Sequence, residues 1–189
     1  MRRLGILLGL LLALNTSTSG AAQLALGSEL PLLEAETLSG DRATLPRDGR
    51  GHPMILVLSF AKSAAKITRP WLEACRAPAA SATSTPVVRC FDVRMLEAVP
   101  GFMRGMVERG MRKGLPEELK RDALLVYADN DAWRERIGGT EEKTAYVIGC
   151  DGEGRVRATA RGEYTEAALK RVLDAIAAKS PAGSQDPRP

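Results

Sequence analysis

The chain has 189 residues, of which 44% are hydrophobic and 26% charged, the balance of an ordinary globular protein. Its formal net charge is +4, and it falls to about +2 if an N-terminal signal leaves with its two arginines. That excess is too small to indicate a nucleic-acid-binding protein. About 167 residues then remain, which suits one domain with a hydrophobic core.

The N-terminus has the pattern of an export signal. Arg2 and Arg3 form a short basic region, and Leu4–Leu14 is an apolar run of eleven residues, too short to cross a bilayer as a stable helix. Small and polar residues follow this run, and we expect cleavage after Ala21 or Ala22. The protein is then periplasmic or secreted; the alternative is an uncleaved N-terminal membrane anchor.

The first half of the expected domain contains a hairpin, a buried strand and a helix. Residues 36–45 predict a β-hairpin around a turn at 39–41. The apolar run Met54–Phe60 is typical of a central strand buried on both faces. Ser63–Cys75 follows as a helix that its first serine can cap, with a kink expected at Pro70.

The second half alternates strands and helices and ends in two adjacent strands and a helix. The expected elements are strand Val87–Val93, helix Pro100–Lys113, strand Ala123–Tyr127, helix Asp131–Arg136, strands Thr144–Ile148 and Arg155–Ala160, and helix Thr165–Ala178 with Thr165 as its cap. This order predicts an α/β fold with parallel early strands and an antiparallel closing hairpin. The predicted organisation is a signal peptide over 1–22, a domain over 23–179 and a disordered tail over 180–189.

Several short segments occur in the order that one superfamily uses. They are Gly27–Pro31, Leu38–Gly40, Leu58–Ala61, Val126–Asp129 with Trp133 and Ile137–Gly138, Ala145–Ile148 and Gly154–Val156. From about residue 26 to 178 the chain resembles the thioredoxin superfamily, especially its periplasmic TlpA-like branch. The resemblance implies a thioredoxin-like three-layer α/β/α sandwich with a mixed central sheet and an N-terminal β-hairpin.

Within that superfamily a second likeness concerns proteins without a redox motif. Ser59-Phe60 at a strand end, a central helix rich in glycine and methionine, and the stretch Tyr146–Arg157 carry it. The chain is similar in these parts to the mitochondrial ATP-synthase assembly factors that have a thioredoxin-like domain. This likeness implies an assembly role.

The resemblance also shows where redox chemistry belongs. Thioredoxin-type exchange needs two thiols at the start of the first long helix, where the helix end lowers the pKa of the first thiol. In this chain those two positions are Ser63 and Lys66, and the segment 142–144 has no proline where the superfamily has a cis-proline. We therefore expect no disulfide exchange at this site and favour a protein that is not an enzyme.

The same position remains a candidate binding site. Ser63 lies there with three cations, Lys62, Lys66 and Arg69, which could hold an acidic partner. The alternative is that Ser63 only caps the helix and that the cations are solvated.

The three cysteines after the signal are the other thiol candidates. Cys75 and Cys90 could form a disulfide, since the helix and strand that hold them should pack together, or both could be small buried hydrophobes. Cys150 precedes a turn, and we expect it to be partly exposed. With no CxxC and one histidine, His52, a structural zinc site is improbable.

The helix Pro100–Lys113 is the candidate interface. Its apolar face comprises Phe102, Met103, Met106, Val107 and Met111, and the opposite face Arg104, Glu108, Arg109, Arg112 and Lys113. A basic amphipathic helix can bind a client protein or an anionic membrane. The alternative is that the methionines pack on the domain's own sheet and the arginines are solvated.

The leading hypothesis is a redox-inactive periplasmic thioredoxin-fold protein that binds envelope proteins or assists their folding or assembly, without cofactor, metal or nucleic acid. One alternative is an atypical thiol oxidoreductase or peroxidase that uses Cys75, Cys90 or Cys150. The other is a small-ligand binding domain at the vacated redox site.

Overall fold

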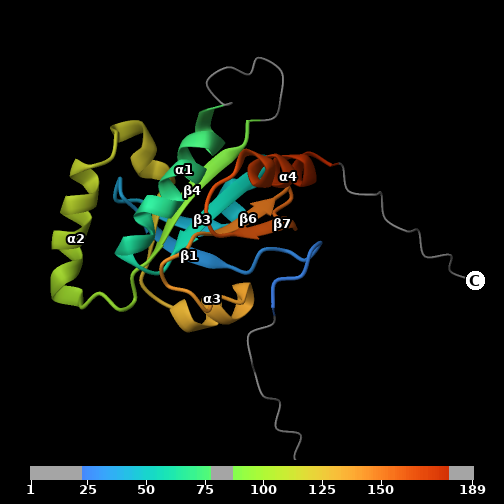
Figure 1. Cartoon of the computed structure of the whole chain (residues 1–189). Coiled ribbons are helices and arrows are strands. Elements are labelled where there is room, and N and C mark those ends of the chain that lie inside the picture. The colour runs from blue at the N-terminus through green and yellow to red at the C-terminus, as the bar shows by residue number, and fades with distance from the viewer. Residues whose placement is uncertain (1–22, 78–86, 179–189) are drawn as a thin grey trace, which may run out of the picture.

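The computed structural model describes residues 23–77 and 87–178 (Figure 1). The expected signal over 1–22 and the tail over 180–189 lie outside the described residues. Along the chain the strands are β1 (Leu33–Thr37), β2 (Arg42–Leu45), β3 (Met54–Ser59), β4 (Arg89–Met95), β5 (Ala123–Val126), β6 (Tyr146–Cys150) and β7 (Val156–Arg161). The helices are α1 (Ala65–Arg76), α2 (Gly101–Lys113), α3 (Asn130–Ile137) and α4 (Glu166–Ala177), with short 3-10 helices η1 (Arg47–Gly49), η2 (Lys62–Ala64) and η4 (Glu117–Asp122).

The seven strands form one mixed sheet in the order β2-β1-β5-β4-β3-β6-β7. β3 pairs in parallel with β4, and β4 with β5, as the intervening helices require. β6 and β7 pair antiparallel as the closing hairpin, and β1 and β2 as the opening one. β3 lies between β4 and β6, and all six of its residues are buried, which confirms the central strand that its apolar run predicted.

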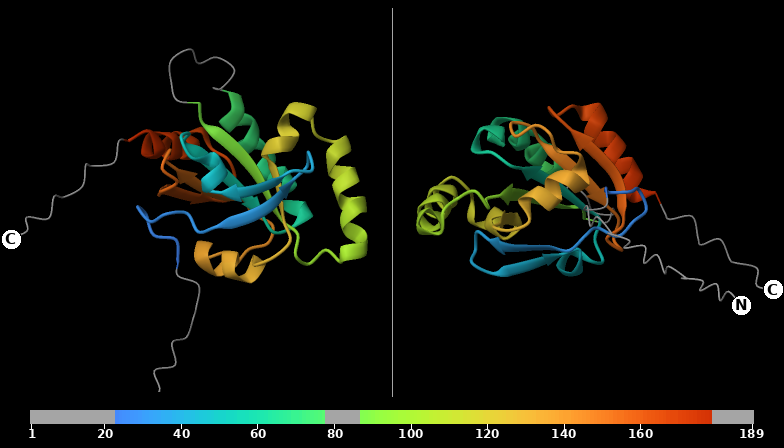
Figure 2. Two further views of the ribbon diagram at one scale, coloured as in Figure 1. Left: turned by 180° about the vertical axis from the view of Figure 1, so that it is seen from behind. Right: turned by 90° about the horizontal axis from the view of Figure 1, so that it is seen from below.

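The sheet is covered on both faces, so the three-layer arrangement is confirmed. Alternate residues of β3 point to opposite sides. Ile55 and Val57 pack with α1 and α4 in one core cluster, which includes Trp71. Leu56 and Leu58 pack in the other cluster, with Trp133 of α3. Figure 2 shows α1 and α4 on one side of the sheet and α3 on the other.

The helix α2 lies outside this sandwich. Figures 1 and 2 show it at the rim of the molecule, at the end opposite to α4. None of its residues is buried, and of its apolar side chains only Met111 packs against a core cluster, a small one with Leu38 and Tyr127. The domain therefore holds α2 by few apolar contacts.

Two helix starts differ in how far the sequence anticipated them. Thr165 caps α4 as expected, because its Oγ1 accepts a hydrogen bond of 3.1 Å from the Ala168 amide. Ser63 does not cap α1. The chain first makes the 3-10 turn η2, so α1 begins only at Ala65, and no side chain caps it. The expectation of a Ser63 cap was wrong because it assumed that the α-helix follows the strand directly.

Candidate functional site

The vacated redox site lies where β3 passes into α1. Ser59 ends the strand and is buried, and the chain then comes to the surface over Phe60 and Ala61. The amide of Ala64 donates a 3.0 Å hydrogen bond to the carbonyl of Ala61, which closes the η2 turn. Ser63 lies inside this turn with its side chain exposed. Its hydroxyl has no capping role and is open to solvent.

The four candidate binding residues lie at one exposed end of the molecule's first long helix. Lys62, Ser63, Lys66 and Arg69 are all exposed. Lys66 and Arg69 are three residues apart and so share a face of α1. Within the described parts of the chain, none of the three cations forms a salt bridge. The structure thus presents a short basic surface whose charges are not neutralised by neighbouring carboxylates; we call it the α1 basic surface.

An aromatic contact of Phe60, which the sequence did not reveal, packs next to this site. The rings of Phe60 and Tyr146 meet edge to face at 5.9 Å, and the Arg134 guanidinium lies 4.5 Å from the centre of the Phe60 ring. Arg134 also pairs with Glu142 at 3.1 Å, in the segment where the superfamily has its cis-proline. Phe60 therefore ties the start of α1 to α3 and to the loop before β6. No local pattern marks this contact, because its members are far apart in sequence.

A buried ion pair lies on β4, beside the strand β3 that leads into the site. The Arg94 Nη2 donates a 2.8 Å hydrogen bond to Asp92 Oδ2, and Arg94 Nε lies 2.7 Å from Asp92 Oδ1 as an ion-pair contact. Arg94 Nη1 also donates to the Ser59 hydroxyl at 3.3 Å. The Asp92 carboxylate is therefore held by Arg94, in a residue that is only 5% exposed.

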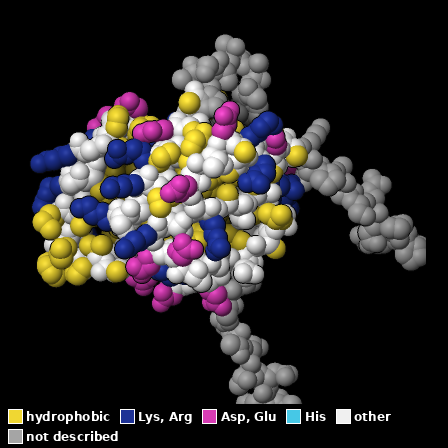
Figure 3. All heavy atoms as spheres, in the orientation of Figure 1, with side chains coloured by type: hydrophobic (Ala, Val, Ile, Leu, Met, Phe, Trp, Pro, Cys, Tyr) yellow, Lys and Arg dark blue, Asp and Glu magenta, His cyan; other side chains and the backbone are white. Residues whose placement is uncertain are grey.

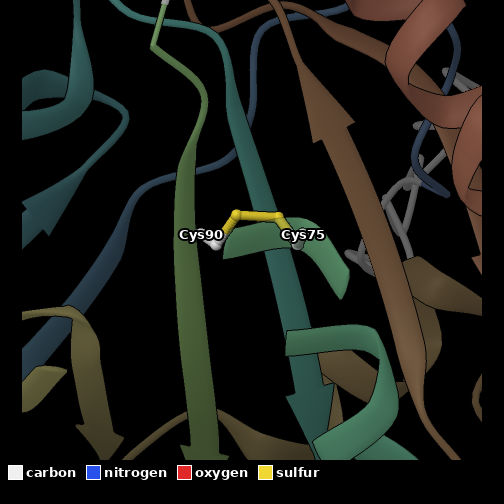
Figure 4. The surroundings of a disulfide bond; sticks show 2 residues. All are labelled: Cys75 and Cys90. Atoms are coloured by element: carbon white, nitrogen blue, oxygen red, sulfur yellow. A yellow bond between two sulfur atoms is a disulfide. The ribbon is translucent and has the colours of Figure 1, made fainter. Parts of the chain in front are cut away.

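A disulfide bond joins Cys75 and Cys90 (Figure 4). The bond links the last turn of α1 to the start of β4, with a Cα–Cα distance of 6.2 Å. Cys75 is 2% exposed and Cys90 4%. By helical rise, Cys75 lies about 15 Å along α1 from Ala65, away from the vacated site. Of the two alternatives that the sequence left open, the structure shows the bridge, and both partners are also buried.

The third cysteine is not where the sequence placed it. Cys150 is fully buried, so the expected partial exposure was wrong. It ends β6, an interior strand of the sheet, and it belongs to the core cluster that also contains Leu56 and Trp133. Burial, with a smaller contribution from Asp151, raises the pKa of its thiol to about 12. At neutral pH the sulfur is protonated and shielded, which makes it a poor nucleophile.

The remaining candidate features among the described residues are surface hollows, metal-ligand clusters and membrane-spanning helices. Two surface hollows of about 380 and 280 Å³ are present, and none of the four vacated-site residues lines either. Residues 23–77 and 87–178 contain no cluster of three or more His, Cys, Asp or Glu that could hold a metal. No helix within those ranges is both long and apolar enough to cross a membrane.

Comparison with solved structures identifies the class of fold. A Chlorobium tepidum protein described as a thiol:disulfide interchange protein, DsbE, superimposes with a TM-score of 0.55 at 16% identity, covering 82% of this chain and 99% of that one. BsSco, a member of the Sco family of cytochrome c oxidase assembly proteins, superimposes with a TM-score of 0.54 at 10% identity, covering 81% of this chain and 94% of that one. The thioredoxin domain of a thiol-disulfide oxidoreductase from Bacteroides vulgatus superimposes with a TM-score of 0.53 at 15% identity, covering 82% of this chain and all of that one.

These likenesses establish the thioredoxin fold for this chain. At such low identity they carry the fold alone, and the residues at the site must carry the function. The sequence matches no protein-family model and no curated protein.

Proposed function

We propose that this protein is an exported, periplasmic thioredoxin-fold protein that binds envelope proteins during their folding or assembly and does not exchange disulfides. One observation carries the proposal: an exposed serine and an exposed lysine, Ser63 and Lys66, occupy the two thiol positions at the start of α1. The basic and apolar N-terminal segment supports export.

The cysteines that remain do not replace the lost pair. Disulfide exchange needs a thiolate that can approach the target sulfur in line. Cys75 and Cys90 are nearly inaccessible, and the pKa of the Cys150 thiol is about 12. A serine hydroxyl is not ionised at neutral pH without a base.

The α1 basic surface suits an acidic segment of a client protein. Lys62, Lys66 and Arg69 are exposed and have no salt-bridge partner among the described residues, so binding breaks no internal ion pair. Exposed charges of this kind mainly steer association and set specificity. Because all four candidate residues are exposed and not enclosed, we favour a macromolecular partner over a small ligand.

A reduction assay tests the negative half of the proposal. We expect the protein to reduce insulin disulfides no faster than a variant with Cys75, Cys90 and Cys150 all replaced by alanine. The specific alternative is an atypical thiol oxidoreductase, which the presence of a disulfide in a thioredoxin fold favours. A rate near that of an ordinary thioredoxin, lost in the triple variant, would establish that alternative instead.

Crosslinking tests the positive half. A photo-reactive residue at position 63, in protein exposed to envelope extract, should give defined crosslinked proteins. Lys66→Glu with Arg69→Glu should remove them, because the charge reversal repels an acidic client. The matched control is Arg42→Glu with Arg171→Glu, which changes the net charge equally at exposed positions elsewhere. Equal crosslinking in both double variants contradicts a client at the α1 basic surface.

A further inference from the structure

The helix α2 turns part of its polar face toward its own domain. Arg112 Nε donates a 2.7 Å hydrogen bond to the Leu38 carbonyl. The Arg104 guanidinium lies 4.3 Å from the centre of the Tyr127 ring, and the Tyr127 hydroxyl donates to Glu108 Oε1 at 2.7 Å. Arg104, Glu108 and Arg112 are spaced four residues apart and so share one face of the helix. Of the arginines on this helix, Arg104 and Arg112 therefore contact the domain, although the Arg112 side chain is still 43% exposed, and Arg109 is exposed.

The outward side of α2 presents large apolar side chains instead. Phe102 is 88% exposed and Met106, one turn later, 57%. Gly105 and Gly110 expose backbone between and beyond them. Figure 3 shows hydrophobic side chains gathered at one end of this helix, with lysines and arginines beside them. Within residues 23–77 and 87–178 no element covers this exposed apolar pair, so the pair needs a separate explanation.

The charge on that outward side has one sign. Glu108 is the helix's one carboxylate, and it faces inward, where it binds Tyr127 and lies 3.9 Å from Arg112. Arg109 and Lys113 are exposed, and they follow the apolar pair toward the C-terminal end. The outward face is thus apolar at its start and cationic at its end, which complements an anionic surface with an apolar interior.

We infer that α2 binds the surface of an anionic phospholipid bilayer as a peripheral helix. Phe102 and Met106 enter the boundary between headgroups and acyl chains, and Arg109 and Lys113 contact lipid phosphates. Two apolar side chains are too few for a stable interface with a second copy, which needs on the order of 1,200 Å² of buried surface. A bilayer contact needs no matched surface, and the rim position of α2 lets it approach a plane (Figure 1). This inference goes beyond the proposed function and does not depend on it.

Vesicle binding tests the inference on protein purified after export. The probes are vesicles of phosphatidylcholine with phosphatidylglycerol and vesicles of phosphatidylcholine alone. We expect cosedimentation with the first kind at low salt and much less with the second, and loss of binding in high salt, which screens the charges. Phe102→Ser with Met106→Ser should weaken binding at least about tenfold, by removal of the buried apolar area. The matched control, Leu26→Ser with Leu32→Ser, removes two equally exposed leucines and should bind normally.

A second measurement reports on α2 directly. Trp71 and Trp133 are 1% and 2% exposed, so they give a constant fluorescence background. A Phe102→Trp variant should shift its emission to shorter wavelength when anionic vesicles are added. All three variants keep the melting temperature, since the changed side chains are exposed.

Three outcomes overturn the inference. The first is absence of wild-type binding to anionic vesicles at low salt, and the second is equal binding by the Phe102→Ser, Met106→Ser variant. In the third, that variant abolishes a concentration-dependent dimer seen in sedimentation, or an acidic protein partner, while vesicle binding is unaffected. Insulin reduction by the wild-type protein, or absence of crosslinking at position 63, would contradict the proposed function but would leave these outcomes unchanged, so the two proposals are separable.

Discussion

The Cys75–Cys90 disulfide should act as a structural brace, and its removal gives the sharpest test. The perturbation is Cys75→Ala with Cys90→Ala. The bond closes a loop between residues 15 apart in sequence, for which loop entropy gives about 3 kcal/mol of stabilisation. Because both sulfurs are buried, the alanines also lose some packing, so about 3 kcal/mol is the minimum expected loss in the free energy of unfolding.

Denaturation in urea measures this loss. The fluorescence of Trp71, which is buried in α1 four residues before Cys75, follows the transition. For a domain of this size about 3 kcal/mol corresponds to a fall in melting temperature of roughly 6–12 °C. Chemically reduced wild type should resemble the double variant, because both lack the same constraint.

Two results would refute the reasoning. One is a double variant within about 1 kcal/mol of the oxidised wild type, which would mean that the cross-link does not constrain the unfolded chain as loop entropy requires. The other is rapid reduction of the bond in the native protein by small thiols, since a disulfide with cysteines 2% and 4% exposed should react only after local opening. The second result would also favour the oxidoreductase alternative.

Three further changes test particular contacts. Arg112→Ala should lower the free energy of unfolding by about 1 kcal/mol through its lost hydrogen bond, whereas Arg109→Ala on the same helix should leave the melting temperature unchanged. Gly149→Ala should cost about 2 kcal/mol in thermal unfolding, because its new Cβ would lie 2.7 and 2.9 Å from two side chains of α4; an unchanged melting temperature would contradict this packing. The pKa of Asp151 is lowered, since burial acts to raise it but two backbone amides and the Arg157 guanidinium outweigh burial. Its stabilisation is therefore complete above the unfolded pKa of about 3.9 and is lost as pH falls through the lower folded value, so in urea unfolding at a series of pH values Asp151→Asn should be less sensitive to that range than wild type.

The sequence by itself determined the central architecture and the absence of a CxxC motif. The nearly continuous apolar run that forms β3 is stable only between two covering layers, so its central place in the sheet followed from composition. The short connection between β6 and β7 required an antiparallel pair, which the structure has. The absence of that motif can be read from the chain itself, because the spacing of its three cysteines needs no geometry to be recognised.

Only the tertiary structure decided which side chains meet. The sequence left the pairing of Cys75 and Cys90 open, because a disulfide depends on the distance between two elements and not on either one alone. It misplaced Cys150, since proximity to a turn does not reveal that the preceding strand is interior. The contacts of Phe60 with α3 and β6 likewise join segments far apart in the chain.

The orientation of α2 illustrates the physical limit most clearly. Helical periodicity separates an apolar from a polar face, but it does not say which face the rest of the domain contacts. Here the Tyr127 ring contacts Arg104, the Tyr127 hydroxyl donates to Glu108, and the Leu38 carbonyl accepts from Arg112. These partners on neighbouring segments satisfy the polar groups at the contact. Because those partners are brought there by the fold, only the tertiary structure could leave Phe102 and Met106 facing outward.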